Sequence, residues 1–256
     1  MCVRTSAAAS YFHSVCLIVL AYNVHPRFPL VLAANRDEFH ERPTAPAHWW
    51  PAAPHIFAGR DLRAGGTWMG ITRSGRFAAL TNHRDLHRPA VQGPSRGLLV
   101  HDALDGTLDV RNTAGYEGFN LLHGTVHELR YHNNLEPVDV PLPPGIHGIS
   151  NALLNTPWPK VERAKEAVRK ALDTSDGTLN EHLFALLRDD VRAADEHLPA
   201  TGLPVEMERA VSPVFIQTNG YGTRCSTVVL VDAQGDVWFE ERTWPGERRV
   251  RERFGL

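Results

Sequence analysis

Cysteine is scarce in this chain of 256 residues, which contains three: Cys2, Cys16 and Cys225. Three thiols cannot pair into a disulfide framework, so we expect a reducing compartment and predict a cytoplasmic protein. The sequence also lacks a Cys-x-x-Cys pair. This absence argues against a structural zinc site and against a dithiol redox site.

Long hydrophobic runs are absent as well. The longest apolar run near the N-terminus covers residues 16–22 and has seven residues, whereas a helix needs roughly 20 to span a bilayer. We therefore predict that the protein is not transmembrane. Residues 1–14 contain one arginine and no acidic residue. They faintly resemble a transit peptide, but they lack the apolar segment of a secretory signal.

The chain has little excess of charge of either sign. Its net charge of −2 at pH 7 gives no electrostatic reason to expect nucleic acid as a partner. Hydrophobic residues make up 43% and charged residues 22%, which is typical of a soluble globular protein. There is no repeat and no linker that would divide the chain, so we predict a single domain. Segment 247–253 mixes Glu and Arg and is predicted to be a solvated tail.

Apolar patterns predict several strands and a few helices. The runs 16–22 and 29–34 favour strands that are buried on both faces. Segment 43–66 is rich in Pro and Gly and is predicted to be a long loop. Many strands with segregated helices indicate an α+β fold in which helices cover the sheets. The other predicted strands are 67–72, 76–81, 119–124, 126–131, 226–232 and 236–241, and the predicted helices are 96–104, 159–173 and 179–189.

Cys16 opens the first predicted strand, and the charged quartet Asn35-Arg36-Asp37-Glu38 follows the second. Buried strands rarely end in four polar residues for packing reasons, because each group needs a partner or solvent. One interpretation is a nucleophile beside an orienting polar cluster. The other is a buried cysteine that packs as a small hydrophobe beside a structural ion-pair network. The residues alone leave both open.

Seven short motifs occur in order along the chain, and together they resemble the NRDE family, also called the transport and Golgi organisation protein 2 family. The resemblance runs from about residue 15 to 243. It implies a four-layer αββα sandwich of the N-terminal-nucleophile (Ntn) hydrolase type, in which the cysteine follows the initiator Met. The motifs are Cys16, Asn35-Arg36-Asp37-Glu38, Gly65-Gly66-Thr67-Trp68, Gly118-Phe119-Asn120-Leu121, Ser150-Asn151-Ala152, Pro157-Trp158 and Tyr221-Gly222-Thr223-Arg224.

The resemblance also bears on the start of the chain, because members of the family begin with Met-Cys and the first strand. Residues 15–256 are then the domain, and residues 1–14 are an extension. Either a GUG codon for Val15 is the true start, or a real leader is removed by processing. A free α-amine on Cys16 has a pKa of about 7.7–8.0, which suits a general base. With residues 1–15 attached, that amine is an amide and this mechanism fails.

The resemblance assigns roles to six residues. Cys16 attacks the substrate, and Arg36 stabilises its thiolate. Asp37 holds the α-ammonium or orients Arg36. Asn82 and Asn151 stabilise an oxyanion, with a plain turn residue as the alternative for each amide. Arg224 orients the substrate or the charge of the site.

Five further residues are predicted to contact the substrate. Gly66 would let the backbone approach a ligand, and Trp68 would form a wall of the cavity or part of the core. Asn35 has a turn cap as its alternative role. The full set is Asn35, Glu38, Gly66, Thr67 and Trp68.

We therefore predict an Ntn-type cysteine hydrolase that acts on a small amide or acyl bond and requires no cofactor. The alternative is a protein that binds or carries haem or an acyl lipid on a hydrolase-like scaffold, and a structural interaction domain is a third hypothesis. The chain has 14 histidines. The pairs His83/His87 and His123/His127 lack a third ligand at a familiar spacing, so no metal site is predicted. Haem stays a candidate ligand through the resemblance alone.

Overall fold

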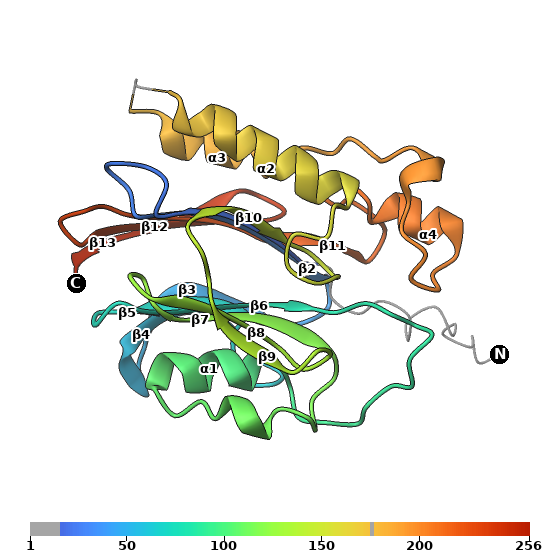
Figure 1. The fold of residues 1–256 in the computed structure, drawn as a ribbon, viewed down its shortest axis with the longest axis horizontal. Helices are drawn as coiled ribbons and strands as arrows, with labels where there is room; N and C mark the ends of the chain where they lie inside the picture. The colour runs from blue at the N-terminus through green and yellow to red at the C-terminus, as the bar shows by residue number, and fades with distance from the viewer. Residues whose placement is uncertain (1–15, 175–176) are drawn as a thin grey trace.

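Two antiparallel sheets stack face to face in the computed structural model, which describes residues 16–174 and 177–256 (Figure 1). The six-stranded sheet has the order β10-β1-β2-β11-β12-β13, and the seven-stranded sheet runs from β3 to β9 in sequence order. The first sheet contains β1 (Cys16–Tyr22), β2 (Leu30–Phe39), β10 (Gly145–Ile149), β11 (Tyr221–Val231), β12 (Asp236–Thr243) and β13 (Arg248–Gly255). The second contains β3 (Thr44–Trp50), β4 (Ala53–Asp61), β5 (Met69–Thr72), β6 (Arg76–Asn82), β7 (Phe119–Thr125), β8 (Leu129–Asn133) and β9 (Val138–Pro141).

Helices cover the outer face of each sheet. In Figure 1, α2 (Pro159–Leu172) and α3 (Leu179–Leu186) lie over the six-stranded sheet, and α1 (Gly97–Asp105) lies under the seven-stranded sheet. The chain also forms α4 (Val205–Ala210) and short 3-10 helices at Val110–Asn112 and Asp195–His197. This layering confirms the predicted α+β fold and the αββα sandwich. The predicted extension, residues 1–14, lies outside the described residues.

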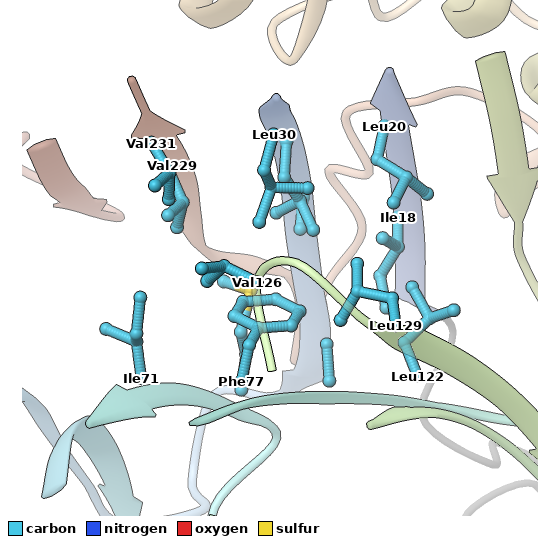
Figure 2. Packing of buried hydrophobic residues seen from close by; sticks show 14 of the residues in the cluster. Ile18, Leu20, Leu30, Ile71, Phe77, Leu122, Val126, Leu129, Val229 and Val231 are labelled. Carbon is cyan, nitrogen blue, oxygen red and sulfur yellow. The ribbon is translucent and has the colours of Figure 1, made fainter. Parts of the chain in front are cut away.

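The alternation of side chains along β1 explains why the strand is apolar on both faces. Ile18 and Leu20 lie in the core between the two sheets, whereas Leu17 and Val19 pack in the core under α2 and α3. Figure 2 shows Ile18 and Leu20 pointing from β1 toward the opposite sheet, where Leu122 lies. Because helices and a second sheet cover the two faces, every position of β1 is buried.

Three sequence predictions about elements were wrong. Segment 43–66 is not one long loop, because it contains β3 and β4, whose pairing tolerates the prolines through two shifts of register. Segment 247–253 is not a solvated tail, because β13 pairs along β12 and partly buries Val250 and Phe254. The hairpin predicted at 119–131 has its turn later than expected, since β8 begins at Leu129.

The polar quartet also lies elsewhere than predicted, because β2 does not end at Ala34. The strand continues to Phe39 and pairs with β1 on one side and β11 on the other. The quartet is therefore inside the strand, and all four residues are buried. Strand alternation then sends successive members of the quartet to opposite faces of the sheet.

Candidate active site

Cys16 is the first residue of β1 and pairs with Arg36 of β2. Its side chain borders a cavity of about 360 Å³, here called the Cys16 cavity. The structure brings six of the predicted site residues to this cavity. They are Cys16, Arg36, Glu38, Thr67, Trp68 and Asn82.

Alternation along β2 divides the quartet between two environments. Arg36 and Glu38 face the Cys16 cavity, and Asn35 and Asp37 face the helices. The Asn35 amide donates to the carbonyl oxygens of Leu187 and Val214 at 2.9 and 2.8 Å. Asn35 therefore ties the sheet to the segments that cover it, and its side chain does not line the Cys16 cavity.

Arg36 carries its charge into the interior between the two sheets. Its guanidinium lies 4.4 Å from the centre of the Trp68 ring and donates to the Thr44 hydroxyl at 3.2 Å. The nearest carboxylate contact is to Glu38, at 3.8 Å. Because this ion pair is long, the positive charge of Arg36 is only partly compensated beside Cys16.

The two asparagines predicted for the oxyanion lie one behind the other. Asn82 borders the Cys16 cavity at the end of β6. Asn151 is fully buried behind it and donates to the Asn82 carbonyl oxygen at 2.8 Å. Next to Asn151, the Ser150 hydroxyl donates to the carbonyl oxygen of Cys16 at 2.9 Å. The Ser150-Asn151 pair thus fixes the backbone on which both Cys16 and Asn82 sit.

Asp37 lies on the helix-facing side of β2, where its carboxyl interacts electrostatically with the ammonium of Lys160. Burial raises the pKa of the Asp37 carboxyl to about 7, although Lys160 and a hydrogen bond from Thr223 oppose the rise. The Thr223 hydroxyl donates to Asp37 at 2.6 Å. Burial likewise lowers the pKa of the Lys160 ammonium to about 8, opposed by the charge of Asp37. Burial thus disfavours the charged form of both groups, and their mutual attraction favours it.

Arg224 and Gly66 do not border the Cys16 cavity. Arg224 sits at a bulge of β11 and donates to the carbonyl oxygens of Phe39 and Arg42 at 2.7 and 3.1 Å. Gly66 makes a close approach, but to protein rather than to a ligand. A Cβ atom on Gly66 would lie 2.5 Å from the backbone of Gly97, at the start of α1.

Sequence reasoning missed Lys160 and Arg96. Arg96 precedes α1, borders the Cys16 cavity and donates to the Gly118 carbonyl oxygen at 3.0 Å. Its position in an irregular segment gave no periodic signal. Lys160 gave a different signal, because a cation in the first turn of a helix is unfavourable next to the positive end of the helix dipole. A lysine in that place without an obvious partner points to a buried acidic group.

No group of three His, Cys, Asp or Glu side chains in residues 16–174 and 177–256 is arranged to hold a metal ion. No histidine of these residues borders the Cys16 cavity. Within the same described ranges, no helix has both the length and the apolar character needed to cross a membrane.

The fold and the site define an αββα sandwich with a thiol, an amide and guanidinium groups around one cavity. The family model described as Transport and Golgi organisation 2 matches residues 15–246. The chain belongs to this family, which confirms the resemblance found from the seven motifs.

Relatives from mammals match most of the chain. The Transport and Golgi organization 2 homolog of Mus musculus is 33% identical over 258 residues, covering 90% of this chain and 93% of the mouse protein. The Homo sapiens homolog is 34% identical over 259 residues, with the same coverage of 90% and 93%. Among solved structures, the Caenorhabditis elegans N-acylethanolamine-hydrolyzing acid amidase ortholog aligns with a TM-score of 0.49 and 9% identity, covering 84% of this chain and 92% of that chain.

The contact between Gly66 and Gly97 gives a first prediction. Gly66→Ala should destabilise the protein by about 1–3 kcal/mol, because the new methyl group must displace backbone atoms. Thermal and urea unfolding measure the change. Gly115→Ala is the matched control, since a Cβ there meets nothing within 4 Å. Equal stability of the two variants would contradict the tight contact.

Proposed function

We propose that the protein is a cysteine hydrolase that cleaves a small amide or related acyl bond in the Cys16 cavity. The observation that carries the proposal is the placement of Cys16 at the wall of a cavity that it shares with Asn82, Arg36 and Arg96. A thiol, amide and guanidinium donors around one cavity are the groups that acyl transfer needs.

In this proposal, positive charge beside Cys16 favours its thiolate, which attacks the acyl carbon. Arg36 and Arg96 supply that charge, because neither forms a close ion pair. Arg36 lies 3.8 Å from Glu38, and Arg96 lies 3.5 Å from Glu117. The Asn82 amide donates to the oxygen that becomes negative during the attack, and Asn151 holds the backbone of Asn82 through its carbonyl oxygen.

The base in this proposal is the α-amine of Cys16, which takes the thiol proton and passes it to the leaving amine as the thioester forms. Water then attacks the thioester while the amine takes its proton, and that proton returns to the Cys16 sulfur as the acid is released. Asp37 and Lys160 lie on the helix-facing side of β2, and the charge of each favours the charged form of the other. The charge of Lys160 also acts on Cys16 and would favour its thiolate without contacting the substrate.

The volume of the Cys16 cavity supports a small substrate. Ligand sites for drug-sized molecules span about 300–1,000 Å³, so a cavity of about 360 Å³ lies at the lower end of that range. We also propose a cytoplasmic location on the basis of the low and odd number of cysteines, three in 256 residues. The carrier hypothesis, in which haem or an acyl lipid occupies the site, gains no specific support from the residues around the cavity.

Thiol labelling and turnover test the role of Cys16. Iodoacetamide should modify Cys16 faster than Cys225, because burial raises the pKa of the Cys225 thiol well above its ordinary value. Fast labelling, and hydrolysis across a panel of small N-acyl amides, should be lost in Cys16→Ala and kept in Cys225→Ala. Unchanged labelling of Cys16→Ala would exclude Cys16 as the reactive thiol. Turnover by that variant would exclude it as the nucleophile.

Replacement of Asn82 tests the oxyanion donor. Asn82→Ala should lower kcat by about 100-fold with a small effect on KM, because the lost hydrogen bond forms mainly in the transition state. Asn112→Ala removes the same amide at an exposed position in a 3-10 helix and should leave kcat unchanged. Equal kcat values for the two variants would remove Asn82 from the mechanism.

The mass of the intact protein tests the identity of the base. Protein isolated from its native source should have the mass of a chain that begins at Cys16, because the α-amine exists only in that form. Edman sequencing or peptide mapping confirms the terminus. If active protein retains residues 1–15, the α-amine cannot be the base, even though Cys16 can still be the nucleophile.

A further inference from the structure

A second cavity lies next to the Cys16 cavity, on the other side of Arg36 and Trp68, which line both. Its volume is about 280 Å³. We call it the Arg224 cavity, since Arg224 borders it and does not border the first. The rest of its lining includes Cys225 and Glu241 from the six-stranded sheet and Arg248 from the start of β13.

The Arg224 cavity has an excess of positive charge. Arg36, Arg224 and Arg248 line it, and Glu241 is the acidic residue in the lining. Within the described parts of the chain, neither Arg224 nor Arg248 forms an ion pair. The contacts of the Arg224 guanidinium are to backbone carbonyl oxygens. Three cationic residues and one acidic residue around a small cavity favour an anionic occupant.

Glu241, the acidic residue in this lining, favours its neutral form more than an exposed carboxyl group does. Burial raises the pKa of the Glu241 carboxyl to about 7, although the nearby charge of Arg36 opposes the rise. The carboxylate accepts a hydrogen bond from the Ala47 backbone at 2.9 Å, and the Cys225 thiol is its other hydrogen-bond partner. Below neutral pH, the cavity therefore presents cations with little opposing charge.

The other walls suit the planar or compact shape of an oxyanion group. The hydroxyl of Thr44 and the indoles of Trp68 and Trp244 border the same space. Guanidinium groups bind carboxylate and phosphate oxygens through paired hydrogen bonds, and indole rings keep water away from such contacts. Arg248 is exposed, so a solute anion can reach its guanidinium from solvent.

We infer that the Arg224 cavity is a binding site for a small oxyanion group, a carboxylate or a phosphate, held between Arg36, Arg224 and Arg248. The inference goes beyond the proposed hydrolase function and does not rest on it. The ligand is recognised by its charge and its oxygen geometry, and Cys16 takes no part in binding it.

Calorimetric titration tests the site with two probes. Inorganic sulfate represents a tetrahedral oxyanion such as phosphate, and succinate represents a planar carboxylate. Their relative affinities therefore show which of the two ligand classes the site prefers. Arg248→Gln should raise the Kd of the probe that binds by about fivefold, as expected for an exposed charge. Arg249→Gln is the matched control. Its guanidinium pairs with Glu247 in the turn before β13, and Arg249 does not line the cavity.

Three results would overturn the inference. The first is that neither probe binds in a saturable way at millimolar concentration. The second is that both variants weaken binding equally, and the third is that neither variant changes it. Arg248 and Arg249 are exposed strand residues, so folding should not limit the comparison, and circular dichroism of each variant verifies it. The titrations are independent of turnover, so failure of the anion site is distinguishable from failure of the hydrolase proposal.

The pH dependence of sulfate binding is a second measurement of the same site. Sulfate keeps its charge near neutrality, so a change of affinity there reports on the protein. Glu241 interacts with the guanidinium of Arg36, which stays charged, and with the Cys225 thiol, whose pKa is raised well above its ordinary value. Arg224 and Arg248 line the same cavity and stay charged as well. Ionisation of Glu241 adds a negative charge as the pH rises through about 7.

Sulfate affinity should therefore fall between pH about 6 and about 8, and Glu241→Gln should abolish this fall. Gln keeps an oxygen that accepts the hydrogen bond from Ala47. An affinity that falls equally in both proteins, or that rises with pH, would contradict the role of Glu241 in the site.

Discussion

The burial of Arg36 between the two sheets is the constraint around which this end of the sandwich is organised. A guanidinium taken out of water needs compensation from its surroundings, and a long ion pair alone does not supply it. Trp68 supplies a ring face at 4.4 Å, and Thr44 supplies an acceptor at 3.2 Å. The loop that contains Gly66 must pack closely on the start of α1, and this packing fixes the backbone next to Trp68. The two cavities on either side of Arg36 exist because its guanidinium and the Trp68 ring form a wall between them.

Apolar patterns predicted the α+β class because strands and helices depend on local periodicity, and the family resemblance supplied the four-layer αββα arrangement. The runs at 16–22 and 29–34 predicted β1 and the first half of β2, and the helical spacing around Val161 predicted α2. The site needed information of longer range. Alternation in β2 could have shown that Asn35 and Arg36 face opposite ways, but only once the strand was known to continue to Phe39. The contacts of Asn35 with Leu187 and Val214 join segments far apart in sequence, which no local pattern encodes.

Cys16 and Cys225 carry the same thiol group, but their strands place the two thiols in different surroundings. Cys16 and Cys225 pair with Arg36 from opposite sides, so they lie in one row across three strands. Strands two positions apart are separated by about 9.6 Å. A disulfide needs its Cα atoms within about 7 Å, so this row cannot form one. Cys225 is hydrogen-bonded to Glu241 and deeply buried, which raises the pKa of its thiol. Both thiols lie near Arg36, but Cys16 borders the cavity that also contains Asn82 and Arg96, and these surroundings make it the reactive candidate.

Lys160 extends this argument to the other face of β2. Its ammonium is buried in the first turn of α2, where both desolvation and the helix dipole oppose a positive charge. The Val211 carbonyl oxygen accepts one hydrogen bond from it at 3.0 Å. A hydrophobic residue would fit the packing of that helix at lower cost, so the requirement for charge must come from its partner. That partner is Asp37, which Lys160 helps to keep ionised against burial. Asp37 follows Arg36 in β2, and Arg36 is the residue that pairs with Cys16. The charge of Asp37 therefore lies on the opposite face of the strand, next to the residue that faces Cys16.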